Sequence, residues 1–109
     1  MAHATGTRSG DRAEATALAS VFPQRRVPIT AVKSMTGHLC GASGAIELIA
    51  AIQAIEHGVI PPTINLLQPD PENDLDCVAQ QPREARIDAV LCNAFGFGGA
   101  NSSLVVRRY

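Results

Sequence analysis

The sequence predicts an α/β fold in which helices pack on a mixed sheet. Two stretches with apolar residues at helical spacing alternate with short β-branched stretches, so that the predicted order is helix, strand, helix, extended segment, strand, strand. A hydrophobic content of 46% in 109 residues argues for one folded domain, or a piece of one, with a modest core.

The first helix is predicted over residues 11–22. Asp11 or Ser9 can cap it, and Glu14 supplies an acidic residue in the first turn, where the helix dipole favours negative charge. Apolar residues recur at helical spacing along this stretch, and Pro23 then stops the helix.

A strand and a second helix follow. Residues 27–32 are rich in β-branched side chains and suit a short buried strand, with a turn over 33–38. The second helix begins at Gly41 or Ala42 and ends at Gly58, because glycine after an apolar periodic run is a common C-terminal signal.

The second half of the chain is predicted to hold an extended connection, a loop, a short strand and a hairpin, in that order: residues 59–66, 69–74, 75–80 and 87–109. Within the hairpin, strands 87–95 and 102–109 flank a glycine-rich connection over 96–101.

The second helix places a carboxylate among small side chains. At about 100° per residue, Glu47 falls beside Ala50, Ala51 and Ala54. Alanines permit close approach of another element, and an enclosed carboxylate is costly unless it is paired or hydrogen-bonded. Lys33 is the nearest cation in sequence, so we predict a Lys33–Glu47 pair, with a solvated Glu47 as the alternative.

Charge and composition exclude several classes of protein. A net charge of −1 with no Lys/Arg run argues against nucleic-acid and anionic-membrane partners. Polar residues interrupt the longest apolar stretch, so no segment is expected to span a bilayer, and the start "MAHATGT" has no signal-peptide pattern. Three cysteines without tight spacing fit reduced thiols, so we expect a cytoplasmic protein.

Taken singly, the histidines carry weak signals. A lone histidine such as His38 is more often a capping or packed residue than a catalyst, and His3 alone would be dismissed as terminal. His57 falls at the end of the second predicted helix, where the dipole favours a cation, and receives no chemical role.

The cysteines also favour structural interpretations. Cys40 precedes a helix, where a thiolate is favoured, but its apolar neighbours favour packing instead. Cys77 and Cys92 fall in predicted strands and are expected to be structural. Metal binding by His3, His38 and Cys40 is disfavoured because the short paired spacings of a zinc motif are missing, so no metal site is expected.

The glycine run "FGFGGAN", residues 95–101, is not a phosphate loop, since it has neither the G-x-G-x-x-G register nor a following Lys-Ser/Thr. Its alternation of Phe and Gly suggests a backbone that passes close to a ligand, with Phe95 or Phe97 lining a pocket. Turn geometry alone explains the segment equally well.

Three motifs occur together and in order: "AHATGT", "KSMTGHLCGASGAIE" and "NAFGFGGAN". Over essentially the whole chain, the sequence resembles the C-terminal part of a β-ketoacyl-acyl-carrier-protein synthase of the elongating kind. These condensing enzymes have a thiolase-like layered fold and act in fatty acid or polyketide synthesis. The resemblance implies an acyltransferase that performs decarboxylative Claisen condensation of an acyl thioester with malonyl-acyl-carrier protein.

The resemblance also implies catalytic residues. His3 and His38 match the two histidines that hydrogen-bond the malonyl thioester carbonyl as decarboxylation converts it into an enolate. Lys33 matches the active-site lysine and Glu47 its glutamate partner, in agreement with the pair predicted from the helical pattern.

Further matches concern substrate binding. Thr5 and Thr7 match the threonines that hydrogen-bond the phosphopantetheine arm, which the acyl-carrier protein carries, so that no intrinsic cofactor is implied. Phe97 matches the gate residue of the glycine loop, whose backbone N–H helps to stabilise the acyl oxyanion. Gly98 and the neighbouring glycines give that loop freedom to move.

The family's nucleophilic cysteine belongs to an N-terminal half that has no counterpart here. None of the three cysteines lies in a segment like the nucleophile motif. We therefore expect residues 1–109 to be the C-terminal segment of a synthase domain and the chain alone to be inactive, whether as a truncated gene product, an artificial fragment or half of a split enzyme. The implied partners are acyl-carrier protein and the cysteine-bearing half, with a homodimer in the full enzyme. The alternatives are a non-catalytic accessory subunit and a structural remnant.

Overall fold

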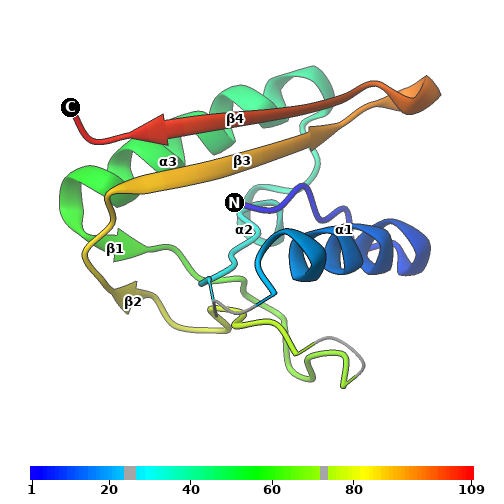
Figure 1. Ribbon diagram of the computed structural model, residues 1–109, viewed down its shortest axis with the longest axis horizontal. Helices are drawn as coiled ribbons and strands as arrows, with labels where there is room; N and C mark the ends of the chain where they lie inside the picture. Colours follow the sequence, from blue (N-terminus) through cyan, green and yellow to red (C-terminus); the bar gives the residue numbers. More distant parts are fainter. Residues whose placement is uncertain (24–26, 72–73) are drawn as a thin grey trace.

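A computed structural model describes residues 1–23, 27–71 and 74–109, and Figure 1 shows their arrangement. The helices are α1 (Arg8–Val21), α2 (Lys33–Thr36) and α3 (Ser43–His57), with 3₁₀ turns at Cys40–Ala42 and Phe97–Gly99. The strands are β1 (Val59–Ile60), β2 (Arg83–Glu84), β3 (Ala89–Phe95) and β4 (Asn101–Arg107). The α/β fold class predicted from the sequence is confirmed. The single mixed sheet is wrong: the strands form two separate antiparallel pairs, β1–β2 and β3–β4, and the parallel pairings are isolated bridges.

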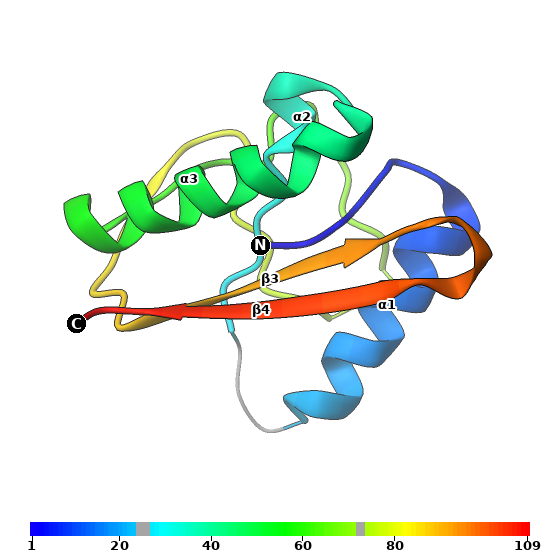
Figure 2. The same ribbon diagram turned by 90° about the horizontal axis from the view of Figure 1, so that it is seen from above.

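A long hairpin is the central feature of the fold. Strands β3 and β4 pair antiparallel, in a register that runs from Ala89 opposite Arg107 to Phe95 opposite Asn101. Helix α3 packs against both strands, and Figure 2 shows the hairpin running between α3 and α1. The hairpin predicted from the sequence is confirmed, and its connection needs glycine because Gly98 and Gly99 have φ of 71° and 79°.

Helix α3 ends where the sequence predicts. Gly58 adopts a left-handed conformation with φ of 66°, and its N–H donates a hydrogen bond to the carbonyl of Ala54 at 2.9 Å. The helix begins at Ser43, after a 3₁₀ turn over Cys40–Ala42.

Helix α1 begins earlier than predicted. Its first residue is Arg8, with Thr7 at the N-cap, so the predicted caps lie inside the helix and Asp11 is the acidic residue of its first turn. Glu14 lies in the helix interior and is buried, and its carboxylate accepts hydrogen bonds from backbone N–H groups of the segment that precedes the helix.

The strand predicted over residues 27–32 is wrong, and the turn that follows contains the one-turn helix α2. In the predicted strand, only Ile29 forms a parallel bridge, to Cys77. The Thr30 hydroxyl donates to the carbonyl of Pro61 at 2.5 Å, and the Thr30 carbonyl accepts the N–H of Ala2 at 2.8 Å, so contacts with separate segments take the place of a continuous ladder.

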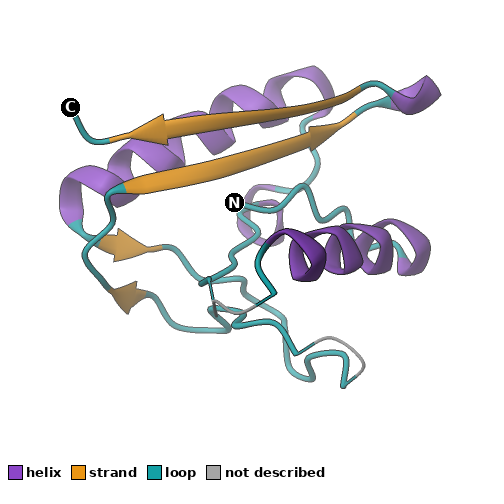
Figure 3. Cartoon of the chain, viewed as in Figure 1, coloured by secondary structure: helices purple, strands orange, loops and turns teal. Residues whose placement is uncertain are grey.

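Two short strands were missed. β1 pairs antiparallel with β2, and both lie close to prolines that made their segments look irregular. The strand predicted over 75–80 is reduced to isolated bridges, including one between Thr63 and Ala79. Figure 3 shows β1 and β2 as two short arrows apart from the long β3–β4 hairpin. The predicted loop over 69–74 falls partly on residues 72–73, outside the described residues.

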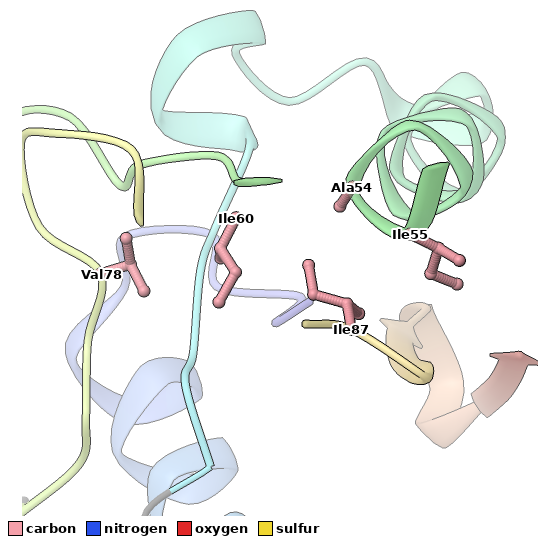
Figure 4. Packing of buried hydrophobic residues seen from close by; sticks show 5 residues of the cluster. All are labelled: Ala54, Ile55, Ile60, Val78 and Ile87. Carbon is pink, nitrogen blue, oxygen red and sulfur yellow. The ribbon is translucent and has the colours of Figure 1, made fainter. Parts of the chain in front are cut away.

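A small apolar cluster holds α3 to the β1–β2 side of the molecule. Figure 4 shows its members: Ala54, Ile55, Ile60, Val78 and Ile87. A cavity of about 580 Å³ extends from Ile60 and Ile87 to Leu18 of α1 and to Phe22, which follows that helix. The apolar core is therefore built from few residues. No helix in the described parts of the chain has the length and hydrophobicity needed to cross a membrane.

Candidate active site

The predicted pair between Lys33 and Glu47 is confirmed. Lys33 is the first residue of α2, and its Nζ donates a hydrogen bond to Oε1 of Glu47 in the first half of α3. The two side chains are 5% and 3% exposed. Burying either charge alone would be costly, so each residue requires the other.

Lys33 also determines the tautomer of His3. Its Nζ lies 3.4 Å from Nδ1 of His3. An ammonium group can only donate, so Nδ1 is the acceptor and the proton of the neutral imidazole is on Nε2. Burial lowers the pKa of His3 below its ordinary value, the positive charge of Lys33 lowers it further, and Glu14 and Glu47 oppose the shift. His3 is thus held as a neutral donor.

His38 is held in the same tautomer by different partners. Its Nδ1 accepts a hydrogen bond from the backbone N–H of Cys40 at 3.1 Å and lies 3.2 Å from the hydroxyl of Ser43. That hydroxyl accepts the N–H of Leu39 at 2.9 Å, so its own proton can be donated to His38. In the neutral ring the proton is therefore on Nε2.

The two imidazoles lie next to each other. Their ring centroids are 5.9 Å apart and the planes meet at 89°. In the described parts of the chain neither Nε2 has a hydrogen-bond partner, so both N–H groups are available to an external acceptor. The structure thus brings together the four predicted catalytic residues, His3, Lys33, His38 and Glu47.

Of the predicted substrate-binding residues, Thr5 is half-buried, as His3 is, and the other three are exposed, as His38 is. The hydroxyls of Thr5 and Thr7 lie 3.2 Å apart at the entrance to α1. Phe97 is fully exposed, and Gly98 lies beside it in the glycine turn. Of the two phenylalanines, Phe95 is the one that contacts the site, with its ring centroid 5.2 Å from that of His3.

Sequence reasoning missed two buried polar residues beside His3. Glu14 accepts hydrogen bonds from the backbone N–H groups of His3 and Ala4, each at 2.9 Å, and from the side-chain amide of Asn93 at 3.0 Å. Glu14 is 5% exposed and Asn93 is 7% exposed. For Glu14, the sequence signal of burial was its position next to Ala15 on the inner face of α1. For Asn93, the only such signal was its position within a predicted strand.

The three cysteines differ in burial: Cys40 is exposed, Cys77 is half-buried and Cys92 is buried. Cys40 is exposed and has φ of 51°, so the prediction that it packs inside is wrong; its apolar neighbour Leu39 is exposed as well. Burial raises the pKa of both Cys77 and Cys92, which favours the protonated thiol. Within the described residues, no three His, Cys, Asp or Glu side chains are grouped to hold a metal ion.

Comparison with known proteins gives the same family as the motifs. Residues 1–67 match the β-ketoacyl synthase C-terminal domain. The tetracenomycin polyketide synthase ketoacyl synthase alpha subunit of Streptomyces glaucescens is 51% identical over 98% of this chain and 26% of that protein. The 3-oxoacyl-[acyl-carrier-protein] synthase 2 of Coxiella burnetii is 45% identical over 98% of this chain and 26% of that protein.

A solved structure extends the likeness to three dimensions. It holds a type II PKS acyl-carrier protein in complex with its ketosynthase bound to the hexaketide, and matches with a TM-score of 0.94 and 37% identity. The match covers 99% of this chain and 27% of that one. The chain spans about a quarter of the length of these relatives, and it belongs to the β-ketoacyl synthase family, whose C-terminal domain it matches.

Proposed function

We propose that this chain supplies the histidine half of a condensing site, which catalyses decarboxylative Claisen condensation of an acyl thioester with malonyl-acyl-carrier protein within a complete synthase. The observation that carries the proposal is the pair of adjacent imidazoles, His3 and His38, each with Nδ1 occupied and Nε2–H available. Two such donors suit a single oxygen atom on which negative charge develops.

The reaction requires that charge at one atom. When the bond from the malonyl α-carbon to its carboxylate breaks, carbon dioxide leaves and the electron pair moves onto the thioester carbonyl oxygen as an enolate. Hydrogen bonds from His3 and His38 stabilise this oxygen. The enolate carbon then attacks the acyl carbon of a cysteine thioester, a carbon–carbon bond forms, and the cysteine leaves as thiolate.

Lys33 supports this chemistry without reacting. Its charge is neutralised by Glu47, and its hydrogen bond to His3 keeps the imidazole in the tautomer that donates through Nε2. The lowered pKa of His3 favours the neutral ring, which can donate one hydrogen bond without carrying a charge.

The substrate arm and partners follow from the same proposal. The hydroxyls of Thr5 and Thr7 suit hydrogen bonds to the phosphopantetheine arm, and Phe97 at the tip of the hairpin suits a gate that moves between half-reactions. The nucleophilic cysteine belongs to a partner segment, acyl-carrier protein delivers both substrates from the cytoplasm, and the full enzyme is a homodimer. The ketosynthase structure with acyl-carrier protein supports that choice of partner.

The test uses a chimeric synthase in which residues 1–109 replace the matching quarter of the Coxiella burnetii enzyme. Mass spectrometry follows acylation of the cysteine and loss of carbon dioxide from malonyl-acyl-carrier protein. His3→Ala and His38→Ala should each slow decarboxylation by about 100-fold or more while acylation persists. His57→Ala is the matched control, since that exposed ring bonds only to Gln53 among the described residues.

Other outcomes identify the alternatives. A chimera that folds and is acylated, yet condenses nothing, would move the accessory role ahead of the enzyme. Acylation of the isolated chain would show that Cys40, Cys77 or Cys92 is a nucleophile, against the present proposal.

A further inference from the structure

We propose that Asn93 is a positioning residue, which holds the His3 segment in its working conformation through Glu14 and ties it to the hairpin that carries the glycine loop. The inference rests on the proposed function, since it concerns how one of the two enolate-stabilising donors is kept in place. Asn93 lies in the middle of β3, far from His3 in sequence but joined to it by a short chain of hydrogen bonds.

Asn93 is buried, with 7% of its surface exposed, and hydrogen-bonds through its side chain and its backbone N–H. Its side-chain amide donates to Oε1 of Glu14 at 3.0 Å, and its Oδ1 accepts the hydroxyl proton of Ser103 at 2.8 Å. Its backbone N–H donates to the carbonyl of Met1 at 3.1 Å. One residue thus contacts α1, the partner strand β4 and the segment that leads to His3.

Glu14 transmits the contact to His3. The same Oε1 that receives the Asn93 amide also accepts the N–H of His3, and Oε2 accepts the N–H of Ala4. Ala4 has φ of 24°, a conformation that an alanine rarely adopts. Hydrogen bonds to a buried carboxylate are strong enough to hold such a residue, and the direction of the His3 side chain depends on that backbone.

Only an amide suits position 93. Oε1 of Glu14 requires a donor, and the hydroxyl of Ser103 requires an acceptor, and asparagine presents both. A carboxylate there would lie at hydrogen-bond distance from Glu14, so one of the two acids would have to take up a proton. The titratable groups that face Glu14 are His3, whose ring is held neutral, and, in the 109-residue chain, the terminal ammonium of Met1, with the Lys33–Glu47 pair beyond His3.

Asn93 is also close to the glycine loop, because both belong to the β3–β4 hairpin. Ser103 lies directly opposite Asn93 in the β3–β4 register, and Phe95, two residues further along the same face of β3, contacts the His3 ring. The glycine turn begins at the next residue, Gly96. Two residues on one face of β3 therefore link the glycine loop to His3: Asn93 acts through Glu14, and Phe95 contacts the His3 ring directly.

The test is Asn93→Asp in the chimeric synthase, assayed for the two half-reactions over a range of pH. At about pH 8 the variant should lose decarboxylation by roughly 100-fold, the size of loss expected from a misplaced catalytic group. Acylation of the cysteine should persist. Lowering the pH towards about 6 should restore part of the loss relative to wild type, because a protonated acid at position 93 can again donate to Glu14.

Two further variants separate positioning from folding. Asn93→Ala removes the donor without adding charge and should give a smaller loss, about tenfold, with the pH profile of wild type. Asn65→Asp makes the same isosteric change at an exposed residue and should leave both half-reactions unchanged. Equal loss of acylation and decarboxylation in Asn93→Asp, with no recovery at low pH, would show a merely structural role and overturn the proposal.

A readout without activity keeps the inference distinct from the proposed function. Amide hydrogen exchange in the 109-residue chain should show protected N–H groups at His3 and Ala4, which become exposed in Asn93→Asp at high pH. Unchanged protection in the variant would overturn the inference, even in an active chimera. An inactive wild-type chimera with the expected exchange pattern would instead count against the proposed function and leave the role of Asn93 in holding His3 supported.

Discussion

Helix α3 serves two regions that are built on different principles. Its first half contributes Glu47 to a polar cluster, which comprises His3, Glu14, Lys33, Glu47 and Asn93. Its second half contributes to the apolar cluster, which comprises Ala54, Ile55, Ile60, Val78 and Ile87.

The two clusters depend on different properties of their members. In the polar cluster each buried donor or acceptor meets a specific partner, and the described residues contain no buried side-chain nitrogen or oxygen without one. In the apolar cluster the side chains have no hydrogen-bonding groups and interact by packing alone, and three of them, Ala54, Ile60 and Ile87, border the cavity. The polar cluster is therefore the region in which a single change of chemistry should matter most, and the following experiments test that difference.

The largest effect is expected from Lys33→Ala. The substitution leaves the carboxylate of Glu47 buried without its partner, which should lower the free energy of unfolding by about 3–5 kcal/mol. Urea denaturation measures the change. Arg86→Ala, which breaks the exposed pair with Asp88, is the control and should cost under about 1 kcal/mol.

The double variant Lys33→Met/Glu47→Leu sharpens this result. It removes both charges together and should be more stable than Lys33→Ala, because no unpaired charge remains buried. A double variant as unstable as the single one would mean that packing, and not charge, holds the polar cluster together.

A smaller loss is expected when the apolar cluster is truncated. Ile87→Ala should lower the free energy of unfolding by about 2 kcal/mol, the low end for such changes, because Ile87 already borders the cavity. Val105→Ala, at a side chain that is 63% exposed, should change it by about 0.5 kcal/mol or less. A loss at Ile87 larger than that at Lys33 would reverse the contrast between the clusters.

The effect of His3 protonation on the free energy of unfolding should be smaller than the effect of truncating Ile87. Its folded pKa lies below the ordinary value of 6.5, so the unfolded chain binds a proton more readily. The stabilising contribution is therefore present above about pH 6.5 and is lost as the pH falls towards the folded pKa. An NMR titration of the ring measures that pKa, and Lys33→Met should raise it by removing a neighbouring positive charge. A fall in the pKa in that variant would contradict the assigned cause.

The smallest effect on stability belongs to Phe97→Ala. Its side chain is fully exposed, so the free energy of unfolding should change by about 0.5 kcal/mol or less. Phe95→Ala is the matched comparison and should cost more, since that ring packs on His3. Thermal unfolding compares the two, and equal losses would show that the glycine turn packs against the rest of the chain in solution.

The parts of the site that depend on local pattern can be predicted from the sequence. Glu47 falls among alanines on one face of α3, and an enclosed carboxylate requires a cation, so the helical pattern alone indicates Lys33 as its partner. The hairpin and the end of α3 at Gly58 likewise follow from local signals of periodicity and glycine.

The features that the sequence did not predict depend on contacts between distant segments. Asn93 reaches Glu14 across 79 positions, which no periodicity in a single stretch can reveal. The failed strand over 27–32 has the same cause, because its residues bond to several separate segments: the backbone of Ile29 pairs with the segment around Cys77, whereas Thr30 and Ala31 bond to Pro61 and Thr63. Tertiary contacts outweighed local propensity at both places.

The hydrogen bond between Glu14 and Asn93 also has a consequence for the order of assembly during synthesis. Its two partners are 79 positions apart. At about 5–20 residues per second, the ribosome needs roughly 4–16 s to make the intervening chain. The segment that contains His3 and Glu14 is therefore made well before β3. Lys33 can meet Glu47 only 14 positions later in the chain, whereas the carboxylate of Glu14 lacks its Asn93 partner until β3 emerges and must be solvated by water meanwhile.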